Sequence, residues 1–399
     1  MTASPRASVA GPAAHAVLPA RGREIEPFHA GQIARQAATL ARAGRHIIPM
    51  HFGQPAAGAP PRALAAAHAM LDAGVPGYWE SRPLVERIVR HYAETYGVTL
   101  APRQVLLTNG ASAALVAVFA ALFDTGDRIG FARPGYAAYR NALNGLQRTV
   151  VEIDGDPADA FRLTAAALAR IPEPLHGLIV ASPGNPTGSM LDRAQLAAIA
   201  QLCRERRTRL ISDEVYHGIT YGKRAVSALE VEPDAIVVNS FSKLYRMPGW
   251  RLGWLVVPEA LAARVSACVV NFFLTAPSLS QQAGLAAFDD LVELEASVRS
   301  YAHNRALLLH GLAGMGIDRV VPPDGAFYLY ADVGHLTDDS LTFCRRLLED
   351  TGISTAPGID FDTRDGGRFV RFSFAVATQE VERAVELLGP WVARQPRRG

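Results

Sequence analysis

The amino-acid sequence predicts an α/β protein whose large domain is built on a seven-stranded, mostly parallel sheet covered by helices, with a smaller α+β domain beside it. Three observations support this fold class. The 399 residues exceed what a single hydrophobic core usually organises. From about residue 100, short β-rich runs alternate with longer Ala/Leu-rich stretches, a pattern typical of parallel strands covered by helices. Strand patterns return beyond residue 320, after a long helical pattern, and indicate a second unit.

Seven β-rich runs are expected to form the large sheet, and they span residues 104–108, 128–132, 149–153, 177–181, 208–212, 235–240 and 252–257. A helix is expected to run from the first of these strands to about Leu122. Residues 192–207 have an amphipathic pattern, and Asp192 is suited to the N-cap of a helix there. Ser81 and Pro83 suit the start of an earlier helix.

The smaller domain is expected to draw on both ends of the chain. We place the large domain at residues 52–290, with residues 24–51 and 291–399 contributing to the small domain. One long helix over residues 280–312 is expected to link the two, and strands are expected at 325–330 and 369–374. Residues 1–23 are rich in Ala and Pro, lack the apolar core of a signal peptide, and are expected to be a flexible tail.

The composition argues against several classes of partner. Hydrophobic residues make up 49% of the chain, charged residues 20%, and the net charge is +2, so we expect neither a nucleic-acid nor a membrane partner. Three separated cysteines without a C-x-x-C pair argue against disulfides and a zinc site, and the eleven histidines show no metal-ligand spacing. We therefore expect no metal and a cytoplasmic location.

Lys243 is the most informative residue of the chain. Only two of the forty Lys and Arg residues are lysines, and the other one, Lys223, lies among turn residues and is interpreted as a surface residue. Lys243 instead follows the apolar run 235–238. A primary amine, unlike a guanidinium, can lose its proton when desolvated and attack a carbonyl carbon. Lys243 is therefore a candidate Schiff-base residue, which points to an aldehyde cofactor.

A second group of residues predicts an anion site. A Gly-Ala-Ser turn at 110–112 joins a strand to a helix, whose free N–H groups and positive dipole end favour an anion. Two serines and an arginine flank Lys243 in the sequence. Together these form a candidate phosphate-binding set, namely Gly110, Ala111, Ser112, Ser240, Ser242 and Arg251.

Two further strand ends carry polar groups. Asn185, in a Pro/Gly turn, has an amide that could donate to a phenolate oxygen. Asp213 ends a buried strand, where a carboxylate needs a cation such as a protonated pyridine nitrogen. We expect the four features to end successive parallel strands at one edge of the sheet, where ligands bind in open α/β folds. An anion cradle, a phenolate donor, a pyridinium partner and an amine together describe pyridoxal 5′-phosphate.

With these motifs in this order, the chain resembles the class I/II aminotransferases, which are pyridoxal-phosphate enzymes of fold type I, over about residues 25–388. The resemblance implies a ping-pong transfer of the amino group of an L-amino acid to a 2-oxo acid, in which Lys243 forms the internal aldimine and later shuttles a proton. It implies that Asp213 keeps the pyridine nitrogen protonated, and that Asn185 and Tyr216 hydrogen-bond the ring oxygen.

The resemblance also implies roles for residues farther from Lys243. Tyr136 is expected to stack on the cofactor ring. Arg371, between apolar strand residues, is expected to grip the substrate carboxylate and to need a buried anionic partner, while the Gly53 backbone approaches the same carboxylate. Tyr78 is expected to reach the phosphate of the neighbouring subunit, which implies a homodimer with its active site at the interface.

One segment departs from the family pattern. The loop at 77–85 is shorter than usual, so Trp79 or Arg82 could occupy substrate space. The substrate side chain is expected to lie near Phe28, Trp79, Tyr136 and Asn271. Other outcomes remain open, because the same cofactor also supports β-elimination, decarboxylation or oxidation of an amino acid. A non-catalytic amino-acid sensor is a more remote alternative.

Overall fold

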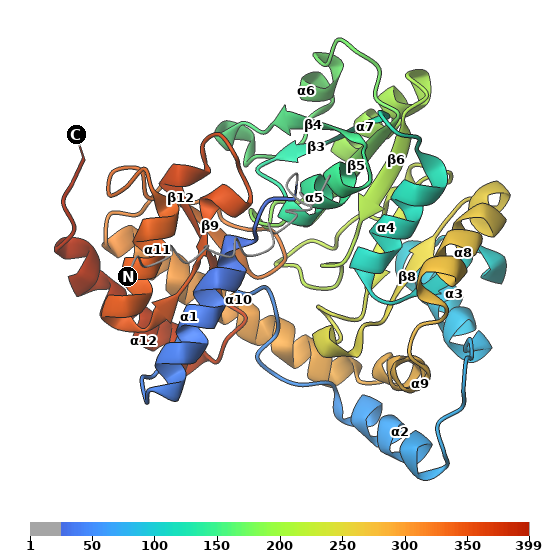
Figure 1. Ribbon diagram of the computed structural model, residues 1–399, viewed down its shortest axis with the longest axis horizontal. Helices are drawn as coiled ribbons and strands as arrows, with labels where there is room; N and C mark the ends of the chain where they lie inside the picture. The colour runs from blue at the N-terminus through green and yellow to red at the C-terminus, as the bar shows by residue number, and fades with distance from the viewer. Residues whose placement is uncertain (1–24, 399) are drawn as a thin grey trace, which may run out of the picture.

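A seven-stranded sheet forms the centre of the large domain in the computed structural model, which describes residues 25–398 (Figure 1). Its strands are β2 (Val105–Thr108), β3 (Arg128–Arg133), β4 (Thr149–Asp154), β5 (Gly177–Ala181), β6 (Arg209–Asp213), β7 (Ile236–Ser240) and β8 (Gly253–Val256). They lie in the order β2-β8-β7-β6-β5-β3-β4, and β8 alone runs antiparallel to its neighbours. The predicted fold class is confirmed, while the tail predicted for residues 1–23 lies outside the described range.

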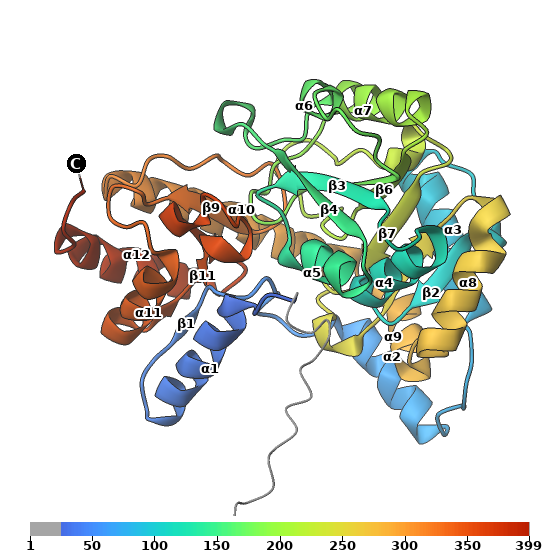
Figure 2. The ribbon, with the colours of Figure 1, turned by 45° about the horizontal axis from the view of Figure 1, so that its top comes forward.

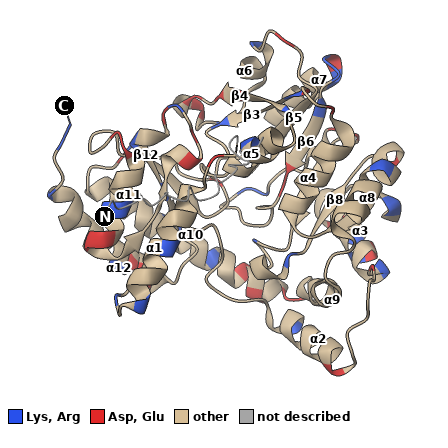
Figure 3. Ribbon diagram, viewed as in Figure 1, with Lys and Arg blue, Asp and Glu red and all other residues tan. Residues whose placement is uncertain are grey.

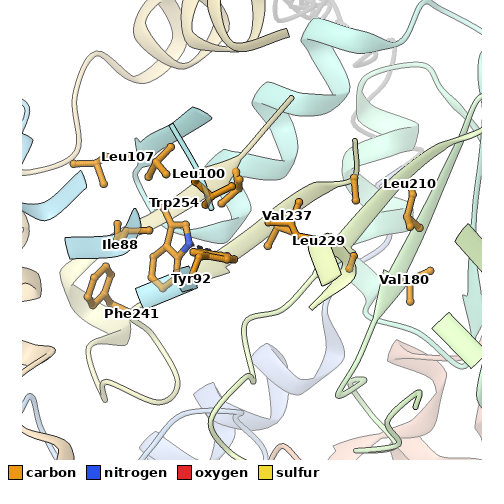
Figure 4. Close-up of a cluster of buried hydrophobic side chains, with 14 of the residues drawn as sticks. Ile88, Tyr92, Leu100, Leu107, Val180, Leu210, Leu229, Val237, Phe241 and Trp254 are labelled. Atoms are coloured by element: carbon orange, nitrogen blue, oxygen red, sulfur yellow. Dashed lines mark hydrogen bonds between the residues drawn. The ribbon is translucent and has the colours of Figure 1, made fainter. Parts of the chain in front are cut away.

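Helices cover both faces of this sheet: α3 (Arg82–Tyr96), α4 (Ala111–Leu122), α5 (Ala137–Gly145), α6 (Ala165–Ala169), α7 (Arg193–Glu205) and α8 (Glu259–Phe273). Two more helices, α2 (Pro61–Asp72) and α9 (Ser278–Ala287), pack against each other, and α9 also packs against α3. Consecutive strand residues point to opposite faces, so Leu178 and Val237 belong to one hydrophobic core and Ile179 and Val238 to the other. Figure 4 shows part of the first core, where the Trp254 indole nitrogen donates to the Tyr92 hydroxyl at 3.2 Å. The strands are apolar on both faces because both faces are covered.

The two ends of the chain meet in a second core. Strand β1 (Ile48–Pro49) pairs in parallel with β10 (Ile353–Ser354), and Ile33 packs into the same cluster as Leu308 and Phe372. Figures 1 and 2 both show α1 beside the C-terminal helices. The other elements of this part are α1 (His29–Arg42), α10 (Leu291–Gly314), β9 (Tyr328–Asp332), α11 (Ser340–Thr351), β11 (Ala356–Pro357), β12 (Phe369–Ser373) and α12 (Thr378–Ala393). The exact domain boundaries stay a prediction.

The single helix predicted over residues 280–312 is wrong, because the structure has two helices there. Helix α9 ends at Ala287 and α10 begins at Leu291. Asp290, between them, accepts a hydrogen bond from the backbone N–H of Arg62 at 2.9 Å, at the start of α2. The break therefore brings a carboxylate to the N-terminus of a neighbouring helix, which its dipole favours.

Charged side chains of both signs are distributed along the ribbon of both domains rather than gathered on one of them (Figure 3). Among residues 25–398, no helix combines the length and the apolar character needed to cross a membrane.

The cap predicted at Asp192 generates a stability test. Its side chain accepts from the backbone N–H of Gln195 at 2.8 Å, and the Gln195 side chain accepts from the N–H of Asp192 at 3.0 Å. We expect Asp192→Ala to lower the free energy of unfolding by about 1 kcal/mol, because the cap is lost. Asp192→Asn should keep most of the parent stability, because the Asn side chain still offers an acceptor oxygen. Urea unfolding monitored by circular dichroism measures the difference. Equal stability of all three proteins would show that the cap is irrelevant.

Candidate active site

The carboxyl ends of β5, β6 and β7 line a cavity of about 310 Å³. The end of β2 lies at the same edge, since β2 and β7 both run antiparallel to β8. Our expectation that the four features end successive strands was wrong, because β8 lies between β2 and β7. The shared edge itself is present, and it collects the polar groups that the sequence singles out.

Most of the predicted site residues lie in the wall of this cavity: Gly53, Ala111, Ser112, Tyr136, Asn185, Asp213, Tyr216, Ser240, Ser242, Lys243, Arg251 and Arg371. Gly110 lies behind Arg251, since a Cβ at position 110 would come within 2.6 Å of the Arg251 guanidinium. Tyr78 is outside the wall, with 83% of its surface exposed.

Lys243 extends from the loop after β7 into the cavity. Its Nζ donates to the backbone carbonyl of Gly53 at 2.6 Å. Burial, followed by the nearby positive charge of Arg371, lowers the pKa of Lys243 from its ordinary range to about 8, against the opposing effect of Asp213. About a tenth of this amine is therefore unprotonated at pH 7, far more than for an ordinary lysine, and the neutral form is the one that a nucleophile requires.

Asp213 is a buried carboxylate held by neutral donors. The Tyr139 hydroxyl donates to Oδ2, and the backbone N–H of Val215 donates to Oδ1 at 3.3 Å. Burial raises the pKa of Asp213, and the Tyr139 and Val215 hydrogen bonds act in the opposite direction. A cation placed against this carboxylate would offset the cost of its burial.

The anion cradle has two parts. Gly110, with φ of +86°, is the N-cap of α4, and its missing side chain lets Arg251 approach the first turn of that helix. The hydroxyls of Ser240 and Ser242 lie 2.8 Å apart, and the N–H of Ser242 also points to Ser240 Oγ at 3.1 Å. Backbone N–H groups, hydroxyls and the positive end of a helix therefore converge.

Arg251 completes the cradle and carries its positive charge. The hydrogen bonds that hold its guanidinium go to carbonyl oxygens, to Pro248 at 3.0 Å and to Asn109 at 3.4 Å. Both partners are neutral and the Arg251 side chain is exposed, so its guanidinium is free to bind an anion such as a phosphate group.

Arg371, on β12, is 2% exposed. Its Nη1 donates to Asn185 Oδ1 at 2.8 Å, and its Nη2 donates to the backbone carbonyl of His51 at 2.6 Å, whereas Nε has no partner among the described residues. We expected a buried anionic partner, but the described protein partners are neutral. The guanidinium remains available to a carboxylate that enters the cavity.

Aromatic side chains form much of the remaining wall. The Tyr216 hydroxyl lies 2.7 Å from the Tyr328 hydroxyl. Tyr136 meets Tyr139 edge-on, with their ring centroids 5.5 Å apart. Phe28 also lines the cavity, and its place near the substrate stays a prediction.

Some expected wall residues lie elsewhere. Trp79, Arg82 and Asn271 do not line this cavity, and their place near the substrate stays a prediction. Ser81 caps α3 as predicted, with its Oγ accepting from Leu84 N–H at 3.3 Å.

Sequence reasoning missed two tyrosines of the wall, Tyr139 and Tyr328. Tyr139 lies one helical turn beyond Tyr136, and this spacing was the available signal. Tyr328 lies in the predicted strand 325–330, where alternation alone does not say which aromatic residue faces a ligand.

An amine, a buried carboxylate, an anion cradle and an aromatic wall fit pyridoxal 5′-phosphate, because Asp213 could pair with its pyridinium nitrogen and Arg251 with its phosphate. Fold and site together define a pyridoxal-phosphate enzyme of fold type I.

Comparisons with known proteins identify the family. Residues 46–388 match the family model aminotransferase class I and II. The chain is 47% identical over 338 residues to a valine–pyruvate aminotransferase of Mycobacterium tuberculosis, covering 83% of this chain and 87% of that relative. A crystal structure of an aminotransferase from M. tuberculosis matches with a TM-score of 0.91 and 45% identity, covering 94% of this chain and 98% of that one. Aspartate aminotransferase from Thermus thermophilus with maleate matches with a TM-score of 0.88 and 27% identity, covering 94% and 99%.

The chain therefore belongs to the aminotransferase class I and II family, and it is an aminotransferase that uses pyridoxal 5′-phosphate.

The pKa of Lys243 predicts how the apoprotein takes up its cofactor. The neutral amine is the reactive form, so the uptake rate is expected to rise with pH through about 8 and then level off. Stopped-flow absorbance of apoprotein mixed with pyridoxal phosphate measures this rate, with Lys243→Ala as the control that forms no covalent linkage. A rate that keeps rising roughly tenfold per pH unit toward 10, as for an ordinary lysine, would contradict the lowered pKa.

Proposed function

We propose that the chain transfers the amino group of an L-amino acid to a 2-oxo acid in a ping-pong cycle, with Lys243 as the catalytic amine. The observation that carries the proposal is the guanidinium of Arg371, which is buried, held by neutral partners and in the wall of the same cavity as Lys243. A substrate carboxylate bound to Arg371 brings its α-amino group into the cavity that Lys243 enters.

The residues around Lys243 have complementary roles in this proposal. When bound, the cofactor supplies an aldehyde and a ring that withdraws electrons from the substrate α-carbon. Lys243 would hold the cofactor covalently, and its free amine would move the proton at the substrate α-carbon. The Asp213 carboxylate would pair with the pyridine nitrogen and favour its protonated form. The Oδ1 atom of Asn185 accepts a hydrogen bond from Arg371. The Nδ2 group of Asn185 would therefore be free to donate to the ring oxygen, beside Tyr216.

The phosphate and the ring are held by the rest of the wall. We propose that Tyr136 stacks on the ring. The phosphate would bind to the anion cradle described above, which consists of Gly110, Ala111, Ser112, Ser240, Ser242 and Arg251.

We further propose that the substrate carries one carboxylate and an apolar side chain. The cationic side chains of the described cavity wall are Lys243, Arg251 and Arg371, and the amine, the phosphate and the α-carboxylate account for all three. Phe28 and Phe52 are apolar residues of this wall, and a second carboxylate would find no further cationic side chain among the described lining residues. The name of the valine–pyruvate aminotransferase relative agrees with this class.

A homodimer is proposed from exposed apolar side chains near the loop that carries Tyr78. This set lies on α2, the loop after it and the end of α8, and consists of Leu64, Leu71, Val75, Tyr78, Val270, Phe272 and Leu274. The Ser278 hydroxyl donates to the carbonyl of Gly77 at 2.9 Å and ties the two segments together. A second copy would cover this surface and receive Tyr78 at its phosphate site.

The cysteines support a cytoplasmic location, which we also propose. Cys203, Cys268 and Cys344 are all free thiols, and two of them are buried. Free thiols persist in reducing compartments.

The dimer proposal predicts that Phe272→Asp yields monomers with weaker cofactor binding. A charge at a covered apolar position opposes association, and the loss of the neighbour's Tyr78 should weaken binding by about tenfold or more. Light scattering gives the mass, and a fluorescence titration gives the cofactor Kd. The control is Gln201→Asp, on α7 at the far side of the large domain. This variant adds the same charge and should change neither the mass nor the cofactor Kd. Monomers that bind cofactor as tightly as the parent would refute the role of Tyr78.

The proposed reaction is tested by titrating the holoenzyme with single L-amino acids, without any oxo acid, while its absorbance is scanned. We expect valine-like amino acids to convert the yellow cofactor to its colourless amine form, and aspartate to act much more weakly. Adding pyruvate should restore the yellow form. Ammonia release with a persistent yellow band would instead indicate elimination or oxidation, and conversion by aspartate alone would contradict the apolar substrate class.

A further inference from the structure

Tyr328 lies in the active-site wall, and the proposed function gives it no task. It is on β9, its side chain is 1% exposed, and it contacts groups at both ends of the cavity. Three of its contacts involve residues with proposed roles, Tyr216, Arg371 and Gly53.

The contact with Tyr216 is a hydrogen bond between two phenol hydroxyls, 2.7 Å apart. Each phenol has a single proton. If Tyr216 donates its proton to the cofactor ring oxygen, Tyr328 has to be the donor in the pair. Burial raises the pKa of both phenols, so both keep their protons at neutral pH. The result is a chain of two donors that ends at the ring oxygen.

The ring of Tyr328 supports Arg371. The guanidinium carbon of Arg371 lies 4.3 Å from the centroid of Tyr328 and 4.6 Å from that of Phe361, so the cation lies against both rings. This placement stabilises a guanidinium without neutralising it.

Gly53 keeps the Tyr328 hydroxyl in place. A Cβ on residue 53 would come within 1.6 Å of Tyr328 Oη, so the hydroxyl lies directly against the backbone whose carbonyl accepts from Lys243. Only glycine leaves room for this approach.

We propose that Tyr328 is a positioning residue that acts at both ends of the site, with its hydroxyl strengthening the hydrogen bond from Tyr216 to the cofactor ring oxygen and its ring orienting Arg371 toward the substrate carboxylate. This inference rests on the proposed function, since it assumes that Tyr216 faces the ring oxygen. Donation by Tyr328 polarises the Tyr216 O–H bond, which makes Tyr216 a better donor. A stronger donor lowers the basicity of the ring oxygen. A less basic ring oxygen stabilises the proton on the cofactor-bound Lys243 nitrogen less, so the pKa of that nitrogen falls.

The hydroxyl is tested by a pH titration of the absorbance of resting holoenzyme, which reads the pKa of the Lys243 nitrogen bound to the cofactor. Tyr328→Phe should raise this pKa by about half a unit to one unit, in the same direction as Tyr216→Phe and by less. Tyr330→Phe is the matched control, because this tyrosine is on the same strand, is buried, and has a hydroxyl without a partner among the described residues. A Tyr328→Phe titration that coincides with those of Tyr330→Phe and the parent protein would overturn the proposal.

The ring is tested separately through substrate affinity. Tyr328→Leu should raise the KM of the donor amino acid about tenfold, since the guanidinium loses its aromatic support, whereas Tyr328→Phe should leave KM within about twofold. Equal KM values for the two variants would overturn the role of the ring. Circular dichroism establishes that both variants fold, and the parent enzyme's response to amino acids tests the proposed function independently of either variant.

Discussion

The folded chain surrounds two buried charges, the Asp213 carboxylate and the Arg371 guanidinium, with neutral hydrogen-bonding partners. Tyr139 and the Val215 backbone hold the first, and Asn185 and the His51 carbonyl hold the second. Such partners fix the orientation of each charged group but do not neutralise its charge. A bound counterion would offset the free-energy cost of burying that charge. The two charges have opposite signs and line one cavity, which makes the site complementary to a ligand with a cationic ring nitrogen and to a substrate with a carboxylate.

This arrangement depends on contact between the two parts of the chain. Arg371 comes from the small antiparallel sheet, while Asn185 follows β5 of the large sheet. Arg133, at the end of β3, adds ion pairs across the same boundary, with Nη1 2.5 Å from Asp362 and 2.9 Å from Asp365. These contacts set the position of Arg371 relative to Lys243, and they explain why residues so distant in sequence line one cavity.

The sequence predicted what local chemistry dictates. Lys243 after an apolar strand and Gly110 before a helix both follow from short-range patterns, and the α/β fold class follows from alternation. The order of strands did not follow, because β8 inserts between β2 and β7 through long-range pairing that no local signal records. The two-phenol contact of Tyr216 with Tyr328 was missed for the same reason, since 112 positions separate these residues and only tertiary packing brings them together.

The hydrogen-bond partners of Arg371 among the described residues are neutral, and we propose that its counterion is the substrate carboxylate. The most direct test is the affinity of the holoenzyme for isovalerate, a monocarboxylate without an amino group, in the parent protein and in Arg371→Met, read from the absorbance of the bound cofactor. We expect Arg371→Met to lower the affinity about 100-fold, because a bidentate charged hydrogen bond is lost. An affinity within about twofold of the parent value, in a variant that still binds the cofactor, would contradict it.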